Sequence, residues 1–373
     1  MGLITEAAEL NVSTAVNVST VSERLIALDP ARLKRAKKAY TTRHFAAAVE
    51  AEPNGYFLRQ GVPAVGDLVL AEVVELGSHT KLEGPHSRRQ SMFVGDEIVV
   101  TYGNRYAPDQ FLAEVPGDLR QCNLVAAGGV AGAVLEQHAA MKPATVIQPI
   151  GLVSTRDRVL NLRDLVPNED APSGGTGSPK VIAVPGTSMN SGKSTTVGCL
   201  VNGLAGSGLT VAAGKATGTG SGNDPRLFTD AGASHVLDFT DFGYPTTFRL
   251  DYDAIRTLLT RLIGRLSRPD VDVVVVEIAD GVLQPETARL LSDPVFHASV
   301  DEVVFSAADA LGATAGIQVL QQHGVKVAAV SGLVTASPLA AREASAVLDV
   351  PVINTRDLSR PDIAHGLFAG QDD

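Results

Sequence analysis

The sequence predicts an α/β fold class. A doubly wound, mainly parallel sheet is expected in the C-terminal half, and a β-rich, barrel-like α+β domain in the N-terminal half. After residue 180, runs of Val and Ala alternate with helical stretches, as strands covered on both faces of a parallel sheet require. Between residues 50 and 115, short apolar runs are separated by Gly and Pro turns, which is typical of a small antiparallel sheet or barrel.

Length and composition bound the class of protein. A chain of 373 residues predicts two domains, and 45% hydrophobic with 19% charged residues is typical of a soluble globular protein. No apolar run approaches the roughly 20 residues of a membrane span, and residues 1–6 lack the order of a secretory signal. Cys122 and Cys199 fit neither a disulfide framework nor a metal knuckle. We therefore expect a cytoplasmic protein with no membrane partner.

Charge argues against a nucleic-acid partner. The net charge is −10, and the longest basic stretch is the short segment 32–38. That segment reads as the solvated face of a helix, because a nucleic-acid-binding arm is usually longer and set in a basic domain.

The N-terminal elements are expected in the following order. Residues 20–48 read as helical, with a fresh helix start at Asp29-Pro30. The β-rich segment 50–115 follows. The glycine turn 128–132 is interpreted as a packing turn, followed by a helical stretch to Met141 and a strand over 144–153.

Residues 167–179 contain almost nothing that a core would bury, so they are interpreted as a linker. The predicted domains are 1–166 and 180–373. In the second domain, strands are expected at 181–184, 210–213, 235–238, 271–276, 302–305 and 325–330. Their alternation with helices predicts right-handed parallel crossovers.

The first of these strands runs into a loop that ends in Gly192-Lys193-Ser194 and opens a helix. Strand, glycine loop, Gly-Lys-Ser and helix form the context of a phosphate-binding loop, the motif of P-loop NTPases. Backbone amides and the positive end of the helix surround the β-phosphate. The residues predicted to cradle the phosphates are Gly186, Thr187, Ser188, Met189, Asn190, Ser191, Gly192, Lys193, Ser194 and Thr195.

Within this loop, Lys193 is expected against the β- and γ-phosphates, and the Ser194 hydroxyl on Mg²⁺. The predicted cofactors are therefore ATP and Mg²⁺.

The loop departs from the common spacing, because Thr187 stands where the first glycine is usual and Gly186 lies one place earlier. In this it resembles the dethiobiotin synthetase and cobyrinic acid a,c-diamide synthase superfamily. The related cell-division and partition ATPases carry a signature lysine early in the loop, where this chain has Thr187 and Ser188.

Three further segments carry the resemblance. Gly214-Lys215 is similar to the family's lysine-bearing strand end, Asn223-Asp224 to its Asn-x-Asp segment, and Glu277-Ile-Ala-Asp280-Gly281 to its Val-Glu-Gly-Ala-Gly-Gly segment. The resemblance implies that Lys193, Lys215 and Glu277 are catalytic. It also implies that Ser194, Asp224 and Glu277 bind Mg²⁺. It covers only the C-terminal half, and the choice of ATP over GTP rests on it alone.

The resemblance implies an ATP-dependent enzyme that transfers the γ-phosphoryl group to a small acceptor, expected to bear a carboxylate, as a synthetase, ligase or kinase. The alternative is a nucleotide-driven switch or metallochaperone-type ATPase that acts on a protein partner. The sequence leaves the acceptor open. It also leaves the oligomeric state open, although the family likeness is compatible with a homodimer.

Two polar regions remain as candidate acceptor sites. The first is a patch in the N-terminal half, where arginines and histidines could receive an anionic substrate such as a carboxylate. A metal pair of His79 and His86 is disfavoured by the spacing. The second is the loop 238–247, expected beside the strand ends. The patch comprises His79, Lys81, Glu83, His86, Arg88, Arg89, Arg105 and Asp109.

Overall fold

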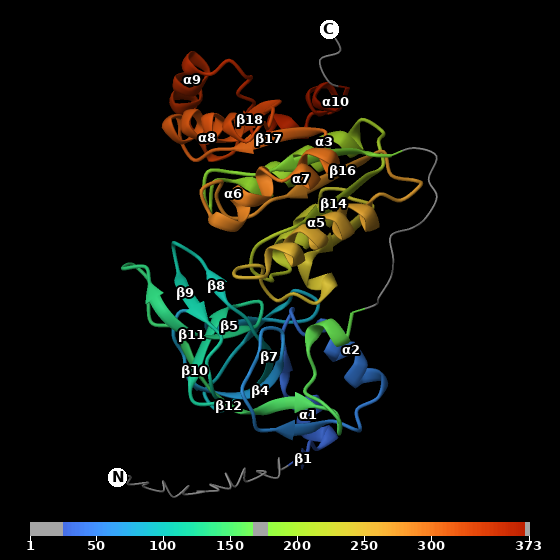
Figure 1. Ribbon diagram of the computed structural model, residues 1–373, viewed down its shortest axis with the longest axis vertical. Helices are drawn as coiled ribbons and strands as arrows, with labels where there is room; N and C mark the ends of the chain where they lie inside the picture. The colour runs from blue at the N-terminus through green and yellow to red at the C-terminus, as the bar shows by residue number, and fades with distance from the viewer. Residues whose placement is uncertain (1–24, 167–177, 370–373) are drawn as a thin grey trace, which may run out of the picture.

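The computed structural model describes residues 25–166 and 178–369. A β-rich half lies at the bottom of Figure 1 and an α/β half at the top. The sequence expectations for residues 20–24 and for 167–177, which include most of the predicted linker, lie outside the described residues. In the parts of the chain that the structure describes, no helix is long and apolar enough to cross a membrane.

The α/β half is built on six parallel strands in the order β15-β14-β16-β13-β17-β18. The predicted parallel sheet is confirmed. Its strands are β13 (Lys180–Val184), β14 (Val211–Lys215), β15 (His235–Asp238), β16 (Val273–Glu277), β17 (Glu302–Ser306) and β18 (Ala329–Ser331).

Helices cover both faces of this sheet, because successive strand residues are apolar and point to opposite faces. In β16, Val274 and Val276 join one core cluster, whereas Val273 and Val275 join the other. The first face is covered by α5 (Tyr252–Leu266), α6 (Pro285–Leu291), α7 (Pro294–Ser299), α8 (Ala310–Gln322) and α9 (Pro338–Val347). The second is covered by α3 (Lys193–Gly206), α4 (Asn223–Asp230) and α10 (Pro361–Ala369).

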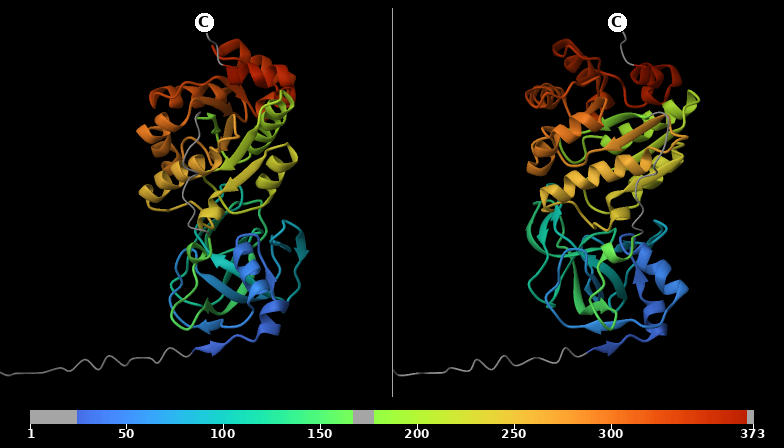
Figure 2. Two further views of the ribbon diagram at one scale, coloured as in Figure 1. Left: turned by 90° about the vertical axis from the view of Figure 1, so that its right-hand side faces the viewer. Right: turned by 45° about the vertical axis from the view of Figure 1, so that its right-hand side comes forward.

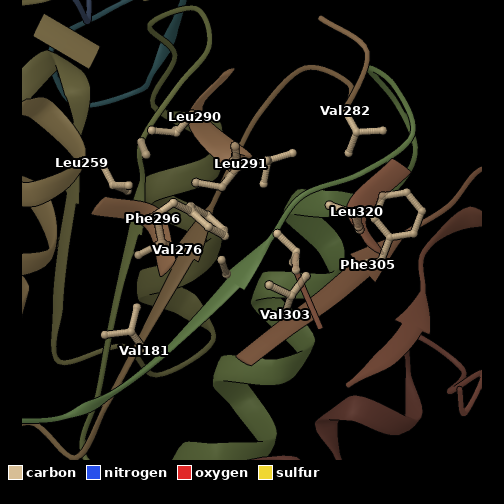
Figure 3. Close-up of a cluster of buried hydrophobic side chains, with 14 of the residues drawn as sticks. Val181, Leu259, Val276, Val282, Leu290, Leu291, Phe296, Val303, Phe305 and Leu320 are labelled. Carbon is tan, nitrogen blue, oxygen red and sulfur yellow. The ribbon is translucent and has the colours of Figure 1, made fainter. Parts of the chain in front are cut away.

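Figure 3 shows the first cluster, in which Phe296 and Leu259 lie beside Val276 while Phe305 meets Leu320. The sheet is therefore the middle layer of three.

The β-rich half contains a closed ring of strands. β12 pairs with β4, β4 with β7, β7 with β11, β11 with β10, and β10 again with β12. Only the β7–β11 pair in this ring is parallel. The ring strands are β4 (Leu68–Glu75), β7 (Glu97–Tyr102), β10 (Cys122–Ala126), β11 (Val130–Gln137) and β12 (Thr145–Ser154). The predicted β-rich character is thus confirmed, but the ring, a small barrel, reaches beyond the predicted segment 50–115, which supplies only β4 and β7.

Shorter elements decorate this barrel. Two helices, α1 (Pro30–Arg35) and α2 (Arg43–Ala51), pack outside it, where Leu33 and Phe45 meet Leu68 and Leu70 of β4. The short strands are β1 (Ile26–Ala27), β2 (Lys37–Lys38), β3 (Phe57–Arg59), β5 (Lys81–Glu83), β6 (Arg89–Ser91), β8 (Arg105–Tyr106) and β9 (Phe111–Glu114). The single-turn 3₁₀ helices are η1 (Leu162–Asp164), η2 (Phe239–Phe242), η3 (Leu333–Ala336) and η4 (Asp357–Ser359).

The predicted helix start at Asp29-Pro30 is confirmed, because the Asp29 carboxylate accepts hydrogen bonds from the amides of Ala31 and Arg32. The helical prediction over 20–48 is wrong at residues 25–29 and 36–42, which are not helical, and right in α1 and α2. The chain leaves the helix after Arg35 to form β2, which pairs with β7.

The helical stretch predicted before Met141 is also wrong, because residues 130–137 form β11. β11 pairs with three strands, β7, β9 and β10. Val130, Ala131 and Gly132 are buried on both faces as a consequence, so this segment carries no strand alternation that the sequence could reveal. The glycine turn before it is a packing turn, as predicted, since a Cβ at Gly129 would collide with Ala39.

The two halves meet along an interdomain seam, the contact between Tyr40 and Arg43 of the barrel half and Asp238 and Asp241 of the α/β half. The Tyr40 hydroxyl donates to Asp238 at 2.9 Å, and Arg43 forms an ion pair with Asp241. Both views in Figure 2 place η2 and its neighbours against the barrel.

Backbone packing tightens the same junction, because a Cβ at Gly128 would collide with the carbonyl oxygen of Gly220. The loop 238–247, expected to shape an acceptor pocket, thus contributes Asp238 and Asp241 to the seam instead.

Candidate functional site

The loop between β13 and α3 is held from below by β17. Gly186 extends the sheet through a bridge to Ser306, and the Thr187 hydroxyl accepts a hydrogen bond from the Ala308 amide. The Ser306 hydroxyl donates to the carbonyl of Ser191 at 2.9 Å. These contacts fix the base of the loop and leave its rim facing outward.

The rim of the loop has an anion-binding backbone. Asn190 and Gly192 have positive φ angles of 63° and 99°, and Gly192 caps the N-terminus of the 14-residue helix α3. A backbone that alternates between right-handed and left-handed conformations turns successive N–H groups toward one point. The N-terminus of the helix adds its positive partial charge. The arrangement suits a phosphate group without any further ligand.

Lys193 is the first residue of α3 and is buried, with 6% of its surface exposed. Its ammonium donates to the carbonyl of Ser188 at 2.7 Å, so it closes the loop on itself. Burial lowers the pKa of Lys193, and the nearby Glu277 carboxylate opposes that effect. The ammonium therefore lies against the backbone of the loop, bound to the carbonyl of Ser188.

Three strand ends converge beside this lysine. Glu277 of β16 is in register with Val184 of β13 on one side and Lys215 of β14 on the other. Lys215 forms an ion pair with Asp224 and lies 3.2 Å from Glu277. Burial opposes the charged form of Lys215, but the two carboxylates outweigh it and raise its pKa. Burial raises the pKa of Glu277.

Ser194, Asp224 and Glu277, the predicted Mg²⁺ ligands, lie within this cluster. Although burial opposes it, Lys215 holds the pKa of Asp224 below its usual range, helped by a hydrogen bond from Ser194. Glu277 Oε2 is buried and has no hydrogen-bond partner among the described residues. Carboxylate and hydroxyl oxygens suit Mg²⁺, so the donor set fits the ion, provided that Lys215 shifts to share the carboxylates.

A cavity of about 630 Å³ opens from this cluster and lies between the two halves of the molecule. Its α/β wall includes Lys193, Ser194, Lys215, Asp224 and Glu277. The structure thus brings all the predicted catalytic and metal-binding residues to one wall. Among the predicted cradle residues, those that also line the cavity are Met189, Asn190, Gly192 and Thr195, whereas Gly186, Thr187, Ser188 and Ser191 do not line it.

The barrel supplies the opposite wall. Four residues of the predicted polar patch line it, His79, Glu83, Arg89 and Arg105. Burial lowers the pKa of His79 to about 4, with a smaller contribution from the charge of Arg105, so the ring is neutral near pH 7.

A fifth member of the patch, Asp109, reaches the phosphate loop, because its carboxylate accepts a hydrogen bond from Asn190 at 2.8 Å. The remaining members, Lys81, His86 and Arg88, do not line the cavity. No cluster of three His, Cys, Asp or Glu side chains suited to a metal occurs within 25–166 and 178–369.

Asp280 is a cavity residue that sequence reasoning missed. It lies three residues beyond Glu277 and has a φ of 66°, in the left-handed region. The only sequence signal was the replacement of a glycine of the family's motif by an aspartate. Burial raises the pKa of this carboxyl, while Lys193 and Lys215 act in the opposite sense.

Comparison with known proteins adds little to this picture. No family model matches the sequence, and no curated protein matches it. Among solved structures, the chain is similar to the signal recognition particle receptor FtsY from Elizabethkingia anophelis, with 20% identity, a TM-score of 0.35, and coverage of 57% of this chain and 76% of that chain.

A nucleotide-binding protein from Archaeoglobus fulgidus in complex with ADP matches with 14% identity, a TM-score of 0.36, and coverage of 52% and 92%. The kinase domain of the Escherichia coli tyrosine kinase ETK matches with 18% identity, a TM-score of 0.30, and coverage of 40% and 65%. At such TM-scores these likenesses decide neither the nucleotide nor the reaction. None of the three is a dethiobiotin or cobyrinic acid a,c-diamide synthase, so that resemblance stays a prediction.

Proposed function

We propose that this protein is a Mg·ATP-dependent enzyme that transfers the γ-phosphoryl group to a small, carboxylate-bearing acceptor, as a synthetase, ligase or kinase. One observation carries the proposal. The anion-binding loop and the Lys193, Lys215 and Glu277 cluster form one wall of a cavity whose other wall is a basic face of the barrel.

The loop amides and Lys193 would hold the β- and γ-phosphates. Lys193 would exchange the Ser188 carbonyl for a phosphate oxygen, which is a stronger acceptor because it is charged. Lys215 would move from Asp224 toward the transferring group and offset its charge. Ser194, Asp224 and Glu277 would hold Mg²⁺, which would supply positive charge to offset that of the phosphates.

The barrel wall would orient the acceptor. It lines the side of the cavity opposite Lys193, Lys215 and Glu277. Arg89 and Arg105 would attract a carboxylate. The two halves are joined by the interdomain seam as well as by the Asn190–Asp109 hydrogen bond.

The alternative, a nucleotide-driven switch that acts on a protein partner, places no small acceptor beside the nucleotide in this cavity. It predicts slow phosphate release that is indifferent to small acids, together with nucleotide-dependent dimerisation.

ADP release from Mg·ATP tests the proposal, because ADP is the product of a kinase as well as of a synthetase or ligase, whereas a kinase releases no free phosphate. The purified protein is assayed alone and with pooled hydroxy, amino and dicarboxylic acids. We expect release that the pool stimulates and that Lys193→Ala abolishes, because the variant removes the ammonium beside the phosphates. Lys326→Ala, an exposed lysine of the same half, is the matched control and should behave as the wild type. Slow release that no pool changes would favour the switch. Absence of Mg·ATP binding would refute the assignment of the loop.

A further inference from the structure

Arg105, on the barrel wall, is a buried cation that forms no direct ion pair with the described residues, although the charges of the Asp109 and Asp280 carboxylates act on it. Only 5% of its surface is exposed. Its terminal nitrogens donate to the Val125 carbonyl and to the Gln110 side chain. Arg105 forms no ion pair with any described residue, and its Nε lacks a hydrogen-bond partner there. Burial lowers its pKa to about 10.

Burying a charged side chain that has no direct ion pair costs free energy. An anionic ligand bound to Arg105 would offset that cost.

Asp280, on the α/β wall, is the complementary feature. Its φ of 66° is unfavourable for an L-residue. Yet its carboxylate makes no hydrogen bond or ion pair with the residues the structure describes that would offset the strain. It lines the cavity, and its charge is felt by Arg105 across it. Backbone strain combined with an unpartnered carboxylate marks a functional position.

We propose that the acceptor carries a carboxylate and, a few bonds away, a hydroxyl or ammonium group, with the carboxylate bound by Arg105 and the hydrogen-bond donor by Asp280. This inference deepens the proposed function and rests on it, since the phosphate loop defines which end of the cavity faces the γ-phosphate.

The polarity of the cavity orients such a molecule. Asp280 lies within the field of Lys193 and Lys215, whereas Arg105 belongs to the barrel. The anchoring carboxylate would therefore lie at the barrel, and the hydroxyl or ammonium group would face the phosphate end. Asp280 also repels a second carboxylate, so it selects hydroxy and amino acids against dicarboxylates through repulsion as well as attraction.

Calorimetric titration of the full chain with four probes tests the assignment. Lactate and β-alanine carry both groups, propionate carries the carboxylate alone, and succinate carries two carboxylates. We expect lactate or β-alanine to bind more tightly than propionate, and succinate to bind most weakly. Arg105→Gln should weaken lactate and β-alanine by at least about tenfold, because it removes the charge that binds the carboxylate.

Asp280→Asn should weaken lactate and β-alanine but strengthen succinate, since asparagine tolerates the left-handed backbone and removes the repulsion. Asp280→Gly, which relieves the strained φ, should give the same preference in a protein at least as heat-stable as the wild type. The matched controls are Arg120→Gln and Asp270→Asn, each at a residue of an exposed ion pair. They should leave the affinities for all four probes unchanged.

Several outcomes would overturn the inference: no probe binds, succinate binds best to the wild type, or Arg105→Gln changes nothing. A loss of Mg·ATP affinity in Arg105→Gln with unchanged lactate affinity would assign the anion to the nucleotide instead. Titration with Mg·ATP separates the two proposals. Retained nucleotide binding without probe binding refutes the acceptor site alone, whereas probe binding without nucleotide binding refutes the proposed function alone.

Discussion

At the scale of single residues, the cavity is defined by charged side chains whose surroundings are unusual for their type. Lys193 and Lys215 are buried among carboxylates, Arg105 is buried without a direct ion pair to any described residue, and Asp280 has a left-handed backbone conformation. The sequence predicts Lys193 and Lys215, because Lys193 follows a glycine loop and Lys215 ends a strand. The partnership of Arg105 with Asp280 is invisible in the sequence, since 175 positions separate them, the difference between their numbers, and only the packing of the two halves brings them to one cavity.

His79 provides a pH prediction at this scale. Its pKa is about 4 in the folded chain against an ordinary 6.5, so between these values the unfolded chain binds a proton that the folded chain does not. Stability should therefore fall as pH decreases from 6.5 to 4, by about 2 kcal/mol for this group after allowance for its partial exposure.

The measurement is urea unfolding at a series of pH values. His79→Gln should remove this part of the pH dependence, whereas His138→Gln, at an exposed position, should retain it. Identical pH profiles for the wild type and His79→Gln would contradict the assignment.

At the scale of elements, the secondary structure of segments with a periodic sequence pattern is predicted well. The secondary structure of segments that pair with several strands is predicted poorly. The six strands of the parallel sheet and the helix after the phosphate loop follow from Val-rich runs and from the loop motif. β11 does not, because Val130 and Ala131 are buried by pairing with both β10, which directly precedes them, and β7. Ala131 and Ala133 favour a helix, and Gly132 is unfavourable in helix and strand alike, so local propensity does not indicate the strand that this pairing produces.

Helix α3 carries the second prediction. Gly203, near its end, packs so closely on η4 that a Cβ would overlap the carbonyl oxygen of Leu358. Gly203→Ala should lower the free energy of unfolding by about 2 kcal/mol, because α10 and η4 must shift.

Gly366 in α10 is the matched control, since its Cβ would meet nothing within 4 Å. Gly366→Ala should stabilise the protein by about 0.5–1 kcal/mol through helix propensity. Chemical denaturation measures both, and equal effects of the two substitutions would refute the packing argument.

At the scale of the whole molecule, the interdomain seam holds together the two halves that line the cavity. Arg43 is its central cation, lying against both Asp238 and Asp241. Burial opposes the charge of Arg43, but the two carboxylates prevail and raise its pKa, so the guanidinium stays charged.

Arg43→Met should therefore cost about 3 kcal/mol, because it leaves two buried carboxylates without their cation. Since the lost contacts join the halves, calorimetry should resolve two unfolding transitions in this variant and one in the wild type. Arg120→Met, at an exposed barrel position, should leave a single transition. A single cooperative transition in Arg43→Met would show that the seam does not couple the halves.

The closed ring of the barrel has a consequence for synthesis. β12 completes the ring by pairing with β4, whose residues lie more than 70 positions earlier, and loop closure over such a separation is slow. A nascent chain that has emerged only as far as β11 exposes the unpaired edges of β4 and β10, which are liable to pair with other chains. Emergence of residues 145–154 removes both edges at once. The barrel can thus close on the ribosome before the phosphate loop is translated, and the α/β half then folds against a finished surface.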